Sequence, residues 1–356
     1  MMMQNKNIYI LCDSTFLNNS SGINTFVVNL YNLLADKYNV YILTDKCFLD
    51  VNSYLKYQIL YVELDNISMN NEKYIDYYSR KISDYILSNI NHNDKNIFVA
   101  NSLATLKTLD IISNTFINSK FLLYTHIGDL LCDDIEYYDF PKEDMDNMIK
   151  IINQNKKIVV GTQSYRLAKF LKSIFEKVVT LYEPIIQYNT FSKITAKFNN
   201  ILVICSNYRR KRLDLVIKYA GELNIPLKIL CTKRSGYYDL QQLATKHNTK
   251  LQILENIPNK DILFHIITSK MLIHFSEIEF FPYSILECAS YIPCLINSNT
   301  IWGKLFPDFV NKVSLDDTDD NIKKRIVEIF NNGKPQLDIK DYMNKCEEQW
   351  VNFIHE

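Results

Sequence analysis

The chain has 356 residues and a formal net charge of zero, with 47% hydrophobic residues. That length is typical of about two domains, and the apolar fraction is ordinary for a folded globular protein. Zero net charge excludes a basic field over the whole molecule, so any contact with nucleic acid has to be local. No stretch approaches the roughly 18 uncharged apolar residues of a transmembrane helix, and we expect none.

The amino-terminal and cysteine patterns indicate a reducing compartment. The first residues lead directly into a strand-like run at 7–12, which leaves no room for a signal peptide. The 8 cysteines are scattered without a C-x-x-C pair, and four lie in or beside apolar runs: Cys12, Cys205, Cys231 and Cys294. We therefore expect reduced, buried thiols, no zinc site and a cytoplasmic location.

Strand-like and helical segments alternate along the chain. In the first half we predict helices at 23–34 and 73–89, and strands at 8–11, 40–44, 97–100, 121–124, 158–160 and 178–181. In the second half we predict strands at 201–205, 227–230, 251–254, 271–275 and 293–296. Helices are predicted between and after them at 211–223, 237–246, 259–268, 283–291 and 319–331, with a last amphipathic segment at 342–354. This alternation predicts parallel sheets covered by helices.

The pattern divides the chain into two α/β domains. We predict Rossmann-like domains at 1–182 and 200–335, a linker of mixed polarity at 183–199, and a carboxyl-terminal helix within 336–356. In open parallel sheets, ligands bind beyond the carboxyl ends of the strands. Polar residues that follow predicted strands are therefore the candidates for a functional site.

The most informative segment is 276–287, Ser-Glu-Ile-Glu-Phe-Phe-Pro-Tyr-Ser-Ile-Leu-Glu. It follows a predicted buried strand, and Pro282 suits the first turn of a helix. Glu279 is therefore predicted on the loop, and Glu287 about one turn into the helix. The free amides of a helix start attract an anion such as a diphosphate, and carboxylates accept hydrogen bonds from sugar hydroxyls.

This segment resembles the E-x7-E motif of retaining glycosyltransferases of the GT-B class, family 4 in particular. The resemblance implies that Glu279 is a catalytic residue touching donor-sugar hydroxyls and that Glu287 holds the ribose. It also places donor contacts at the helix start, on Phe281, Pro282, Tyr283 and Ser284. Phe280 stands where the family usually has glycine, so the loop backbone is expected to differ. A solvated loop glutamate and a helix-surface glutamate are the alternative interpretation.

The same resemblance implies the fold and extends to the basic segment 206–214, Ser-Asn-Tyr-Arg-Arg-Lys-Arg-Leu-Asp. The implied fold is α/β GT-B, two Rossmann-like domains facing a cleft, with the last helix crossing back to the first domain. Lys211 falls on the family lysine that neutralises the leaving diphosphate. The family arginine falls on Ser206, so Arg209 or Arg210 is expected to compensate. Four cations at a helix start oppose its dipole and predict an anionic partner. A solvated basic turn, or a contact to DNA phosphates, is the alternative.

The first half offers weaker candidates. Gly22 opens a helix after the first strand, where the family has a glycine-rich turn. The resemblance implies that Gly22 lets the loop approach the donor diphosphate or the acceptor, and we assign it to donor binding. Asn24 beside it is a predicted acceptor contact; a plain capped turn is the alternative. His126 and Asp129 follow the strand at 121–124, and the resemblance implies that they lie near the reacting sugar, with Asp129 as an acceptor-side base. Two further residues after a strand are predicted acceptor contacts, Asn101 and Ser102. Two D-x-D strings, 144–146 and 317–319, lie at or within predicted helices, so we predict no metal and no cofactor.

The acceptor is the most open part of the interpretation. Segments 100–105, 123–129, 291–296 and 302–306 resemble bacteriophage DNA α-glucosyltransferases that modify hydroxymethylated cytosine. This favours a nucleotide-sugar donor such as UDP-glucose and an acceptor in double-stranded DNA with hydroxymethylated pyrimidines, in the host cytoplasm. A glycosyltransferase of bacterial cell-surface polysaccharide or glycan is the first alternative. A non-catalytic nucleotide-sugar-binding protein, or a GT-B isomerase or phosphorylase relative, is the second.

Overall fold

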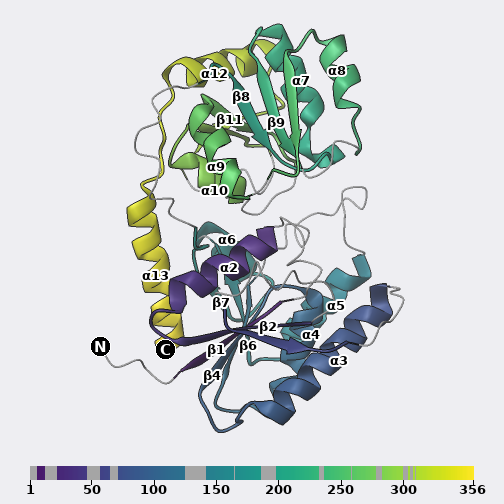
Figure 1. The fold of residues 1–356 in the computed structure, drawn as a ribbon, viewed down its shortest axis with the longest axis vertical. Helices are drawn as coiled ribbons and strands as arrows, with labels where there is room; N and C mark the ends of the chain where they lie inside the picture. Colours follow the sequence, from purple (N-terminus) through teal and green to yellow (C-terminus); the bar gives the residue numbers. More distant parts are fainter. Residues whose placement is uncertain are drawn as a thin grey trace. The chain divides into compact units, whose positions relative to one another are not determined.

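The computed structural model describes residues 6–12, 22–45, 57–64, 71–124, 142–163, 165–185, 198–231, 236–257, 259–277, 283–299, 304, 308 and 310–356. The chain forms two compact units (Figure 1). The first comprises Met1–His126, Phe140–Pro184 and Met343–Glu356, and the second comprises Ile127–Asp139 and Ile185–Tyr342. None of the helices in the described ranges is long and apolar enough to cross a membrane.

The first unit is built on a parallel sheet whose described strands run in the order β3-β2-β1-β4-β5-β6-β7. These strands are β1 (Asn7–Leu11), β2 (Asn39–Asp45), β3 (Ile59–Val62), β4 (Asn96–Ala100), β5 (Lys120–Tyr124), β6 (Ile158–Thr162) and β7 (Val178–Thr180). The helices between them are α2 (Gly22–Leu34), α3 (Asn71–Asn89), α4 (Leu103–Ile112), α5 (Lys142–Gln154) and α6 (Tyr165–Leu171). The central strands are nearly all buried because helices cover both faces of a parallel sheet.

A row of aromatic rings fixes the register at the centre of this sheet. Tyr9 on β1 pairs in register with Tyr41 on β2 and Phe98 on β4, and each neighbouring ring centroid lies 5.3 Å from that of Tyr9. Phe98 stacks in turn on Phe121 of β5. Cross-strand aromatic pairs of this kind stabilise one strand alignment over its neighbours.

The second unit repeats the architecture with its own parallel sheet, in the order β10-β9-β8-β11-β12-β13. The strands are β8 (Ile201–Ile204), β9 (Leu227–Cys231), β10 (Leu251–Glu255), β11 (Met271–His274), β12 (Cys294–Asn297) and β13 (Asn311–Val313). The helical elements are η4 (Arg209–Lys211), α7 (Leu213–Glu222), α8 (Leu240–Lys246), α9 (Asn259–Thr268), α10 (Tyr283–Ala289) and α12 (Asp319–Asn332). Alternate strand residues such as Val203, Ile229 and Ile273 share one core with α7, α8 and α12.

The last helix, α13 (Ile339–His355), packs on the first unit, as predicted. Trp350 is 1% exposed and lies among Phe26 of α2 and Tyr124 of β5, and its indole Nε1 donates to the carbonyl of Tyr182 at 2.9 Å. Lys6 and Lys120 donate to carbonyls in its last turn. Cations at that position satisfy orphan carbonyls and complement the helix dipole.

Most predicted elements are confirmed, and the differences have local causes. The predicted helix at 237–246 begins only at Leu240, because Asp239 is its N-cap and accepts hydrogen bonds from the amides of Gln241 and Gln242. In the basic segment, α7 begins at Leu213 rather than at residue 211. Arg212 has φ 48, a left-handed conformation that separates η4 from α7.

Candidate functional site

The second sheet has its topological switch point at β8, which lies between β9 and β11. Chain connections leave the carboxyl ends of β8 and β11 in opposite directions, and ligands of open α/β sheets bind in the crevice formed there. Two of the sequence-derived candidate segments follow these two strands. They are the basic residues of η4 after β8 and the segment that leads from β11 towards α10.

Lys211 lies at this switch point. Burial, and after it the positive charge of Lys211, holds the pKa of His274 well below its ordinary value. The same charge opposes the rise in the pKa of Cys205 that burial causes. His274 is the last residue of β11, and Cys205 directly follows β8. Lys211, which is half-buried, therefore places its charge beside the ends of both strands.

The two strand-end segments are tied together by Glu277, a residue for which the sequence predicted no role. Its backbone amide donates to the carbonyl of Arg210 at 2.8 Å. Its Oε1 accepts from Nη1 of Arg212 at 2.6 Å, and the guanidinium Nε also donates to Asp214 Oδ1 at 3.3 Å. These contacts hold the cation-bearing turn against the segment after β11.

The Arg212 contacts narrow one expectation. The four cations at 209–212 predict an anionic partner, and for Arg212 that partner lies within the protein, in Asp214 and Glu277. Asp214 also lies in the first turn of α7, where a carboxylate suits the helix dipole. Arg209, Arg210 and Lys211 lie in the separate turn η4.

Aromatic side chains and Asn207 hold this basic turn. Arg210 lies over the ring of Tyr208, 5.3 Å from its centroid, and Arg209 lies over Tyr237 at 5.9 Å. Asn207 is buried and exchanges hydrogen bonds with the backbone of Tyr238, 3.1 Å from its amide and 2.9 Å from its carbonyl. A Cβ on Gly236 would lie 2.3 Å from the carbonyl oxygen of Asn207, so this approach requires glycine.

We expect the Arg212–Glu277 ion pair to contribute measurably to stability. Both side chains are about a quarter exposed, so the coupling free energy in a double-mutant cycle of Arg212→Met and Glu277→Gln should be about 1 kcal/mol. Methionine leaves the left-handed backbone strain unchanged, so the cycle reports the side chains alone. Urea unfolding of the four proteins measures it.

The matched control is the exposed pair Arg325–Glu328, spaced three residues apart on α12, for which we expect about 0.3 kcal/mol. Equal coupling in the two pairs would mean that the two strand-end segments are not held together by this contact.

Glu287 and Ser284 share one face of α10. Every other described side chain in the helix is buried, namely Tyr283, Ile285, Leu286, Cys288 and Ala289. Glu287 and Ser284 are three residues apart, a spacing that places side chains on one helix face, and both are half-buried. Burial raises the pKa of Glu287 to about 7. A half-buried carboxylate beside a serine offers acceptors to hydroxyl groups.

The other predicted site residues divide by location. Glu279, Phe281, Pro282, His126 and Asp129 lie outside the described residues. Gly22 begins α2, and Asn24 lies in its first turn. The structure thus places two groups of predicted site residues. One is Lys211 with its neighbouring arginines, near the ends of β8 and β11. The other is Ser284 with Glu287, on α10.

Asn101 and Ser102 follow β4, which adjoins β1 at the switch point of the first sheet. Ser102 is the N-cap of α4 in a capping box with Thr105, so its hydroxyl has a structural role. Asn101 is 3% exposed, and its side-chain amide has no hydrogen-bond partner among the described residues. A buried polar group in that state is expensive, which keeps Asn101 as the stronger candidate of the two.

The D-x-D strings have ordinary positions. Asp146 is exposed on α5, and Thr318 is the N-cap of α12, with its Oγ1 accepting from the amide of Asn321 at 3.3 Å. Within the described ranges, no group of three or more His, Cys, Asp or Glu side chains is arranged to hold a metal ion.

No protein-family model matches the sequence, and no curated protein sequence matches it. Solved structures do match over nearly the whole chain. Sucrose-phosphate synthase from Thermosynechococcus elongatus has a TM-score of 0.71 at 11% identity, covering 99% of this chain and 97% of that one.

Two further structures show the same likeness. TarM from S. aureus, in complex with fondaparinux, alpha-GlcNAc-glycerol and UDP, has a TM-score of 0.72 at 10% identity, covering 99% and 100%. HepE from Anabaena, in complex with UDP-glucose, has a TM-score of 0.66 at 12% identity, covering 97% and 99%. At such low identity these likenesses concern the fold alone. They show that this chain has the GT-B fold, as the sequence predicted.

Proposed function

We propose that the protein is a retaining, metal-independent glycosyltransferase that moves a sugar from a nucleotide-sugar such as UDP-glucose to a hydroxyl acceptor. One observation carries the proposal: the switch point of the second sheet places Lys211 at the ends of β8 and β11, in a segment tied by Glu277 to the one that leads to α10. Ligands named for GT-B neighbours, UDP and UDP-glucose, have the diphosphate and ribose that such residues suit.

Each residue has a physical task in this proposal. The nucleoside diphosphate gains charge as it leaves, and fixed cations stabilise that charge; Lys211 is assigned this role, assisted by Arg209 or Arg210. The carboxylate of Glu287 accepts hydrogen bonds from the ribose hydroxyls. The carboxylate of Glu279 accepts hydrogen bonds from the hydroxyls of the donor sugar. The departing diphosphate itself helps to deprotonate the acceptor, so the protein supplies orientation and charge stabilisation.

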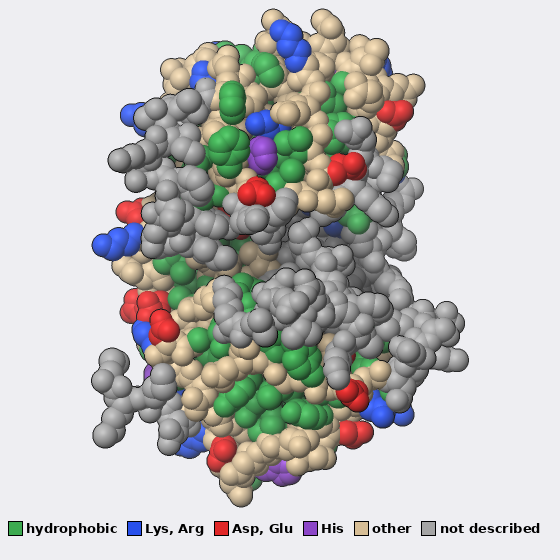
Figure 2. Space-filling model, viewed as in Figure 1, with side chains coloured by type: hydrophobic (Ala, Val, Ile, Leu, Met, Phe, Trp, Pro, Cys, Tyr) green, Lys and Arg blue, Asp and Glu red, His purple; other side chains and the backbone are tan. Residues whose placement is uncertain are grey.

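For the acceptor we propose a hydroxymethylated pyrimidine in double-stranded DNA. Its assigned contacts are Asn24, Asn101 and Ser102. His126 and Asp129 are assigned to the region of the reacting sugar, and Gly22 is assigned to the donor. The basis is the resemblance of four short segments to phage DNA α-glucosyltransferases, and a location in the cytoplasm of an infected host belongs to the same proposal. Such an enzyme has to reach the base within the duplex or flip it out. The chain has a formal net charge of zero, and acidic and basic side chains are interspersed on the face that Figure 2 shows, so we expect weak binding to unmodified DNA that is lost as salt rises.

A carbohydrate acceptor is the second candidate, because the TarM complex named above contains alpha-GlcNAc-glycerol. The test is parallel transfer of labelled sugar to hydroxymethylated duplex, unmodified duplex and bacterial surface oligosaccharide. Labelling of the modified duplex alone is the expected result. Labelling of the oligosaccharide alone would overturn the DNA acceptor and keep the glycosyltransferase. Nucleotide-sugar binding without transfer to any of the three would favour a non-catalytic binding protein.

The raised pKa of Glu287 predicts a pH dependence of nucleotide binding. With a pKa of about 7, the carboxyl group is mostly protonated at pH 6 and ionised at pH 8, and only the ionised form accepts two ribose hydrogen bonds well. The affinity for UDP should therefore rise from pH 6 to pH 8. Glu287→Gln should bind UDP about tenfold more weakly at pH 8, because a lost hydrogen bond to a charged group costs about 1 to 3 kcal/mol.

Calorimetric titration of UDP at the two pH values measures this effect, and the variant corrects for the ionisation of UDP itself. The free energy of unfolding should have the opposite pH dependence to the affinity for UDP. The folded state holds the Glu287 proton to higher pH than the unfolded state, so wild-type stability falls as pH rises from about 4.5 through 7, whereas Glu287→Gln lacks that loss. An equal affinity of both proteins at pH 8 would remove Glu287 from the site.

A further inference from the structure

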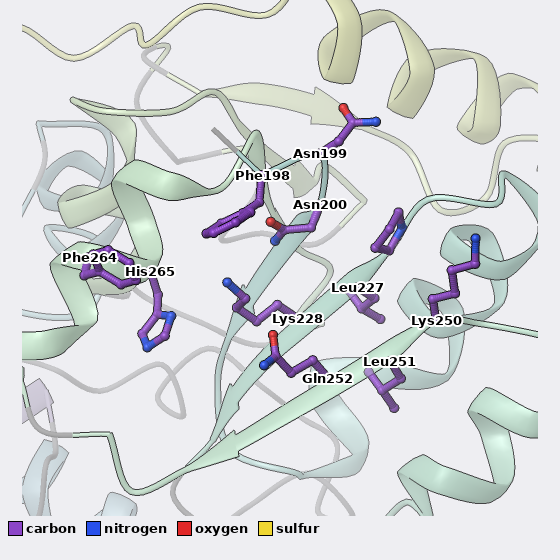
Figure 3. A pocket seen from close by; sticks show the side chains of 11 residues that line it. Phe198, Asn199, Asn200, Leu227, Lys228, Lys250, Leu251, Gln252, Phe264 and His265 are labelled. Carbon is purple, nitrogen blue, oxygen red and sulfur yellow. The ribbon is translucent and has the colours of Figure 1, made fainter. Parts of the chain in front are cut away.

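A cavity of about 770 Å³ lies in the second unit at the amino ends of its strands. It is lined by residues that precede or begin β8, β9 and β10 and by the end of α9, including Asn200, Lys228, Gln252, Phe264 and His265 (Figure 3). The candidate donor residues follow the carboxyl ends of strands in the same sheet. The cavity is therefore a separate feature, at the opposite edge.

Lys228 is the unusual residue in this cavity. It interrupts the otherwise apolar strand β9, Leu-Lys-Ile-Leu-Cys, and is 8% exposed. It pairs in register with Leu202 on β8 and Gln252 on β10. Its Nζ lies 5.2 Å from the ring centroid of Phe198, and no described carboxylate or carbonyl accepts a hydrogen bond from it. Figure 3 shows its amino group directed into the space between the sheet and α9.

An ammonium group in this position is costly without a partner. Burial lowers the pKa of Lys228, which expresses the cost of removing the charge from water. A cation–π contact with Phe198 offsets only part of that cost. Methionine or leucine at the same strand position would have no charge to remove from water. The lysine is therefore explained best by an anion that occupies the cavity.

Two more polar atoms in the cavity wall lack partners. His265 Nδ1 and Asn200 Oδ1 are buried without a hydrogen bond in the part of the chain that the structure describes. Burial, and then the charge of Lys228, lowers the pKa of His265, which keeps its imidazole neutral. The Gln252 side chain, exposed beside Lys228 in the register of the sheet, adds an amide donor. An ammonium, an imidazole and an amide thus converge on one space.

The rest of the wall is suited to an apolar body. Phe198 and Phe264 are 56% and 45% exposed although they are large and aromatic. They border the cavity from the segment before β8 and from α9 (Figure 3). Ligand pockets of this size combine mostly apolar walls with a few convergent polar groups. A bare inorganic ion would use the lysine and leave both rings exposed.

We propose that this cavity binds a small organic anion, a carboxylate or phosphate attached to an aromatic body. The anionic group pairs with Lys228, with hydrogen bonds from His265 and Gln252, and the aromatic body lies against Phe198 and Phe264. The site is independent of the proposed donor site and does not require the protein to be a glycosyltransferase.

The test is calorimetric titration of the full chain with four probes: 2-naphthoate, 2-naphthyl phosphate, the neutral 2-naphthamide and inorganic phosphate. We expect saturable binding of at least one naphthyl anion, and affinities at least tenfold weaker for the amide and for inorganic phosphate. Lys228→Met should weaken binding of that anion at least tenfold. Lys246→Met, a change at an exposed lysine on α8, should leave it unchanged.

Thermal unfolding separates a lost site from a damaged fold. Lys228→Met should melt at the same temperature as the wild type or higher, because methionine removes a partly desolvated charge at similar volume. The proposal is overturned if neither naphthyl anion binds the wild type, if the amide binds as tightly as the anions, or if Lys228→Met retains wild-type affinity. UDP titrated into the same variant reports the donor site separately.

Discussion

Replacing Lys211 with methionine should lower the turnover of a nucleotide-sugar about 100- to 1,000-fold, the range found when one preorganised group that stabilises developing charge is removed. Lys211 lies beside the ends of β8 and β11, where its charge acts on His274 and Cys205. The charge it is proposed to stabilise grows in the transition state as the diphosphate departs. The effect should therefore fall mainly on kcat, with a smaller change in the Kd for UDP.

Initial rates of UDP release from UDP-glucose with a saturating acceptor measure this effect. Lys246→Met on α8 is the matched control and should keep wild-type kinetics. A kcat for Lys211→Met within threefold of the wild-type value would show that this lysine does not meet the leaving group. A rise in the Kd for UDP as large as the fall in kcat would instead indicate a role in ground-state binding.

Replacing Trp350 with alanine should lower the free energy of unfolding by about 3 to 5 kcal/mol, as large-to-small changes at fully buried aromatic residues do. Trp350 is 1% exposed and contacts rings from α2 and β5. Its indole also donates to the Tyr182 carbonyl, close to the point where the chain leaves the first unit. The variant loses both the packing and the hydrogen bond.

Two further variants divide that effect. Trp350→Phe keeps most of the packing and should lose about 1 to 2 kcal/mol through the lost indole hydrogen bond and the smaller ring; the Tyr182 carbonyl keeps its contact with the Cys346 thiol. Glu348→Ala, at an exposed position of the same helix, should stay within about 0.5 kcal/mol of the wild type. Urea unfolding monitored by far-ultraviolet circular dichroism provides the values. A loss of less than 1 kcal/mol for Trp350→Ala would mean that α13 is not integral to the first unit.

The sequence predicted the sheets well because central parallel strands are buried on both faces and therefore consist of continuous apolar runs. It missed β3 and β13, which lie at the edges of their sheets. β3 is mostly half-buried, and β13 has three residues, two of them polar. β13 has no apolar run that distinguishes it from a loop, so its pairing with β12 alone defines it. β3 does carry a short apolar run, Ile-Leu-Tyr-Val, which the sequence prediction overlooked.

In the candidate site too, local sequence patterns were predictable and contacts between distant segments were not. The placement of Lys211 after β8 and of Glu287 within α10 was predicted, because motif spacing and a strand-then-helix pattern specify it. The contacts of Glu277 with Arg210 and Arg212, and those of Asn207 with Tyr238, join segments far apart in the chain. No local pattern encodes such approaches. The Lys228 cavity was missed for a similar reason, since a single lysine in an apolar strand gives no sign of what faces it.

The most direct measurement of the central claim is a crystal structure of the protein with bound UDP. The account predicts the nucleotide at the carboxyl edge of the second sheet, with Lys211 Nζ within hydrogen-bonding distance of the diphosphate and both Glu287 oxygens directed at the ribose. UDP bound elsewhere, with Lys211 pointing into bulk solvent and Glu287 away from the ribose, would contradict it.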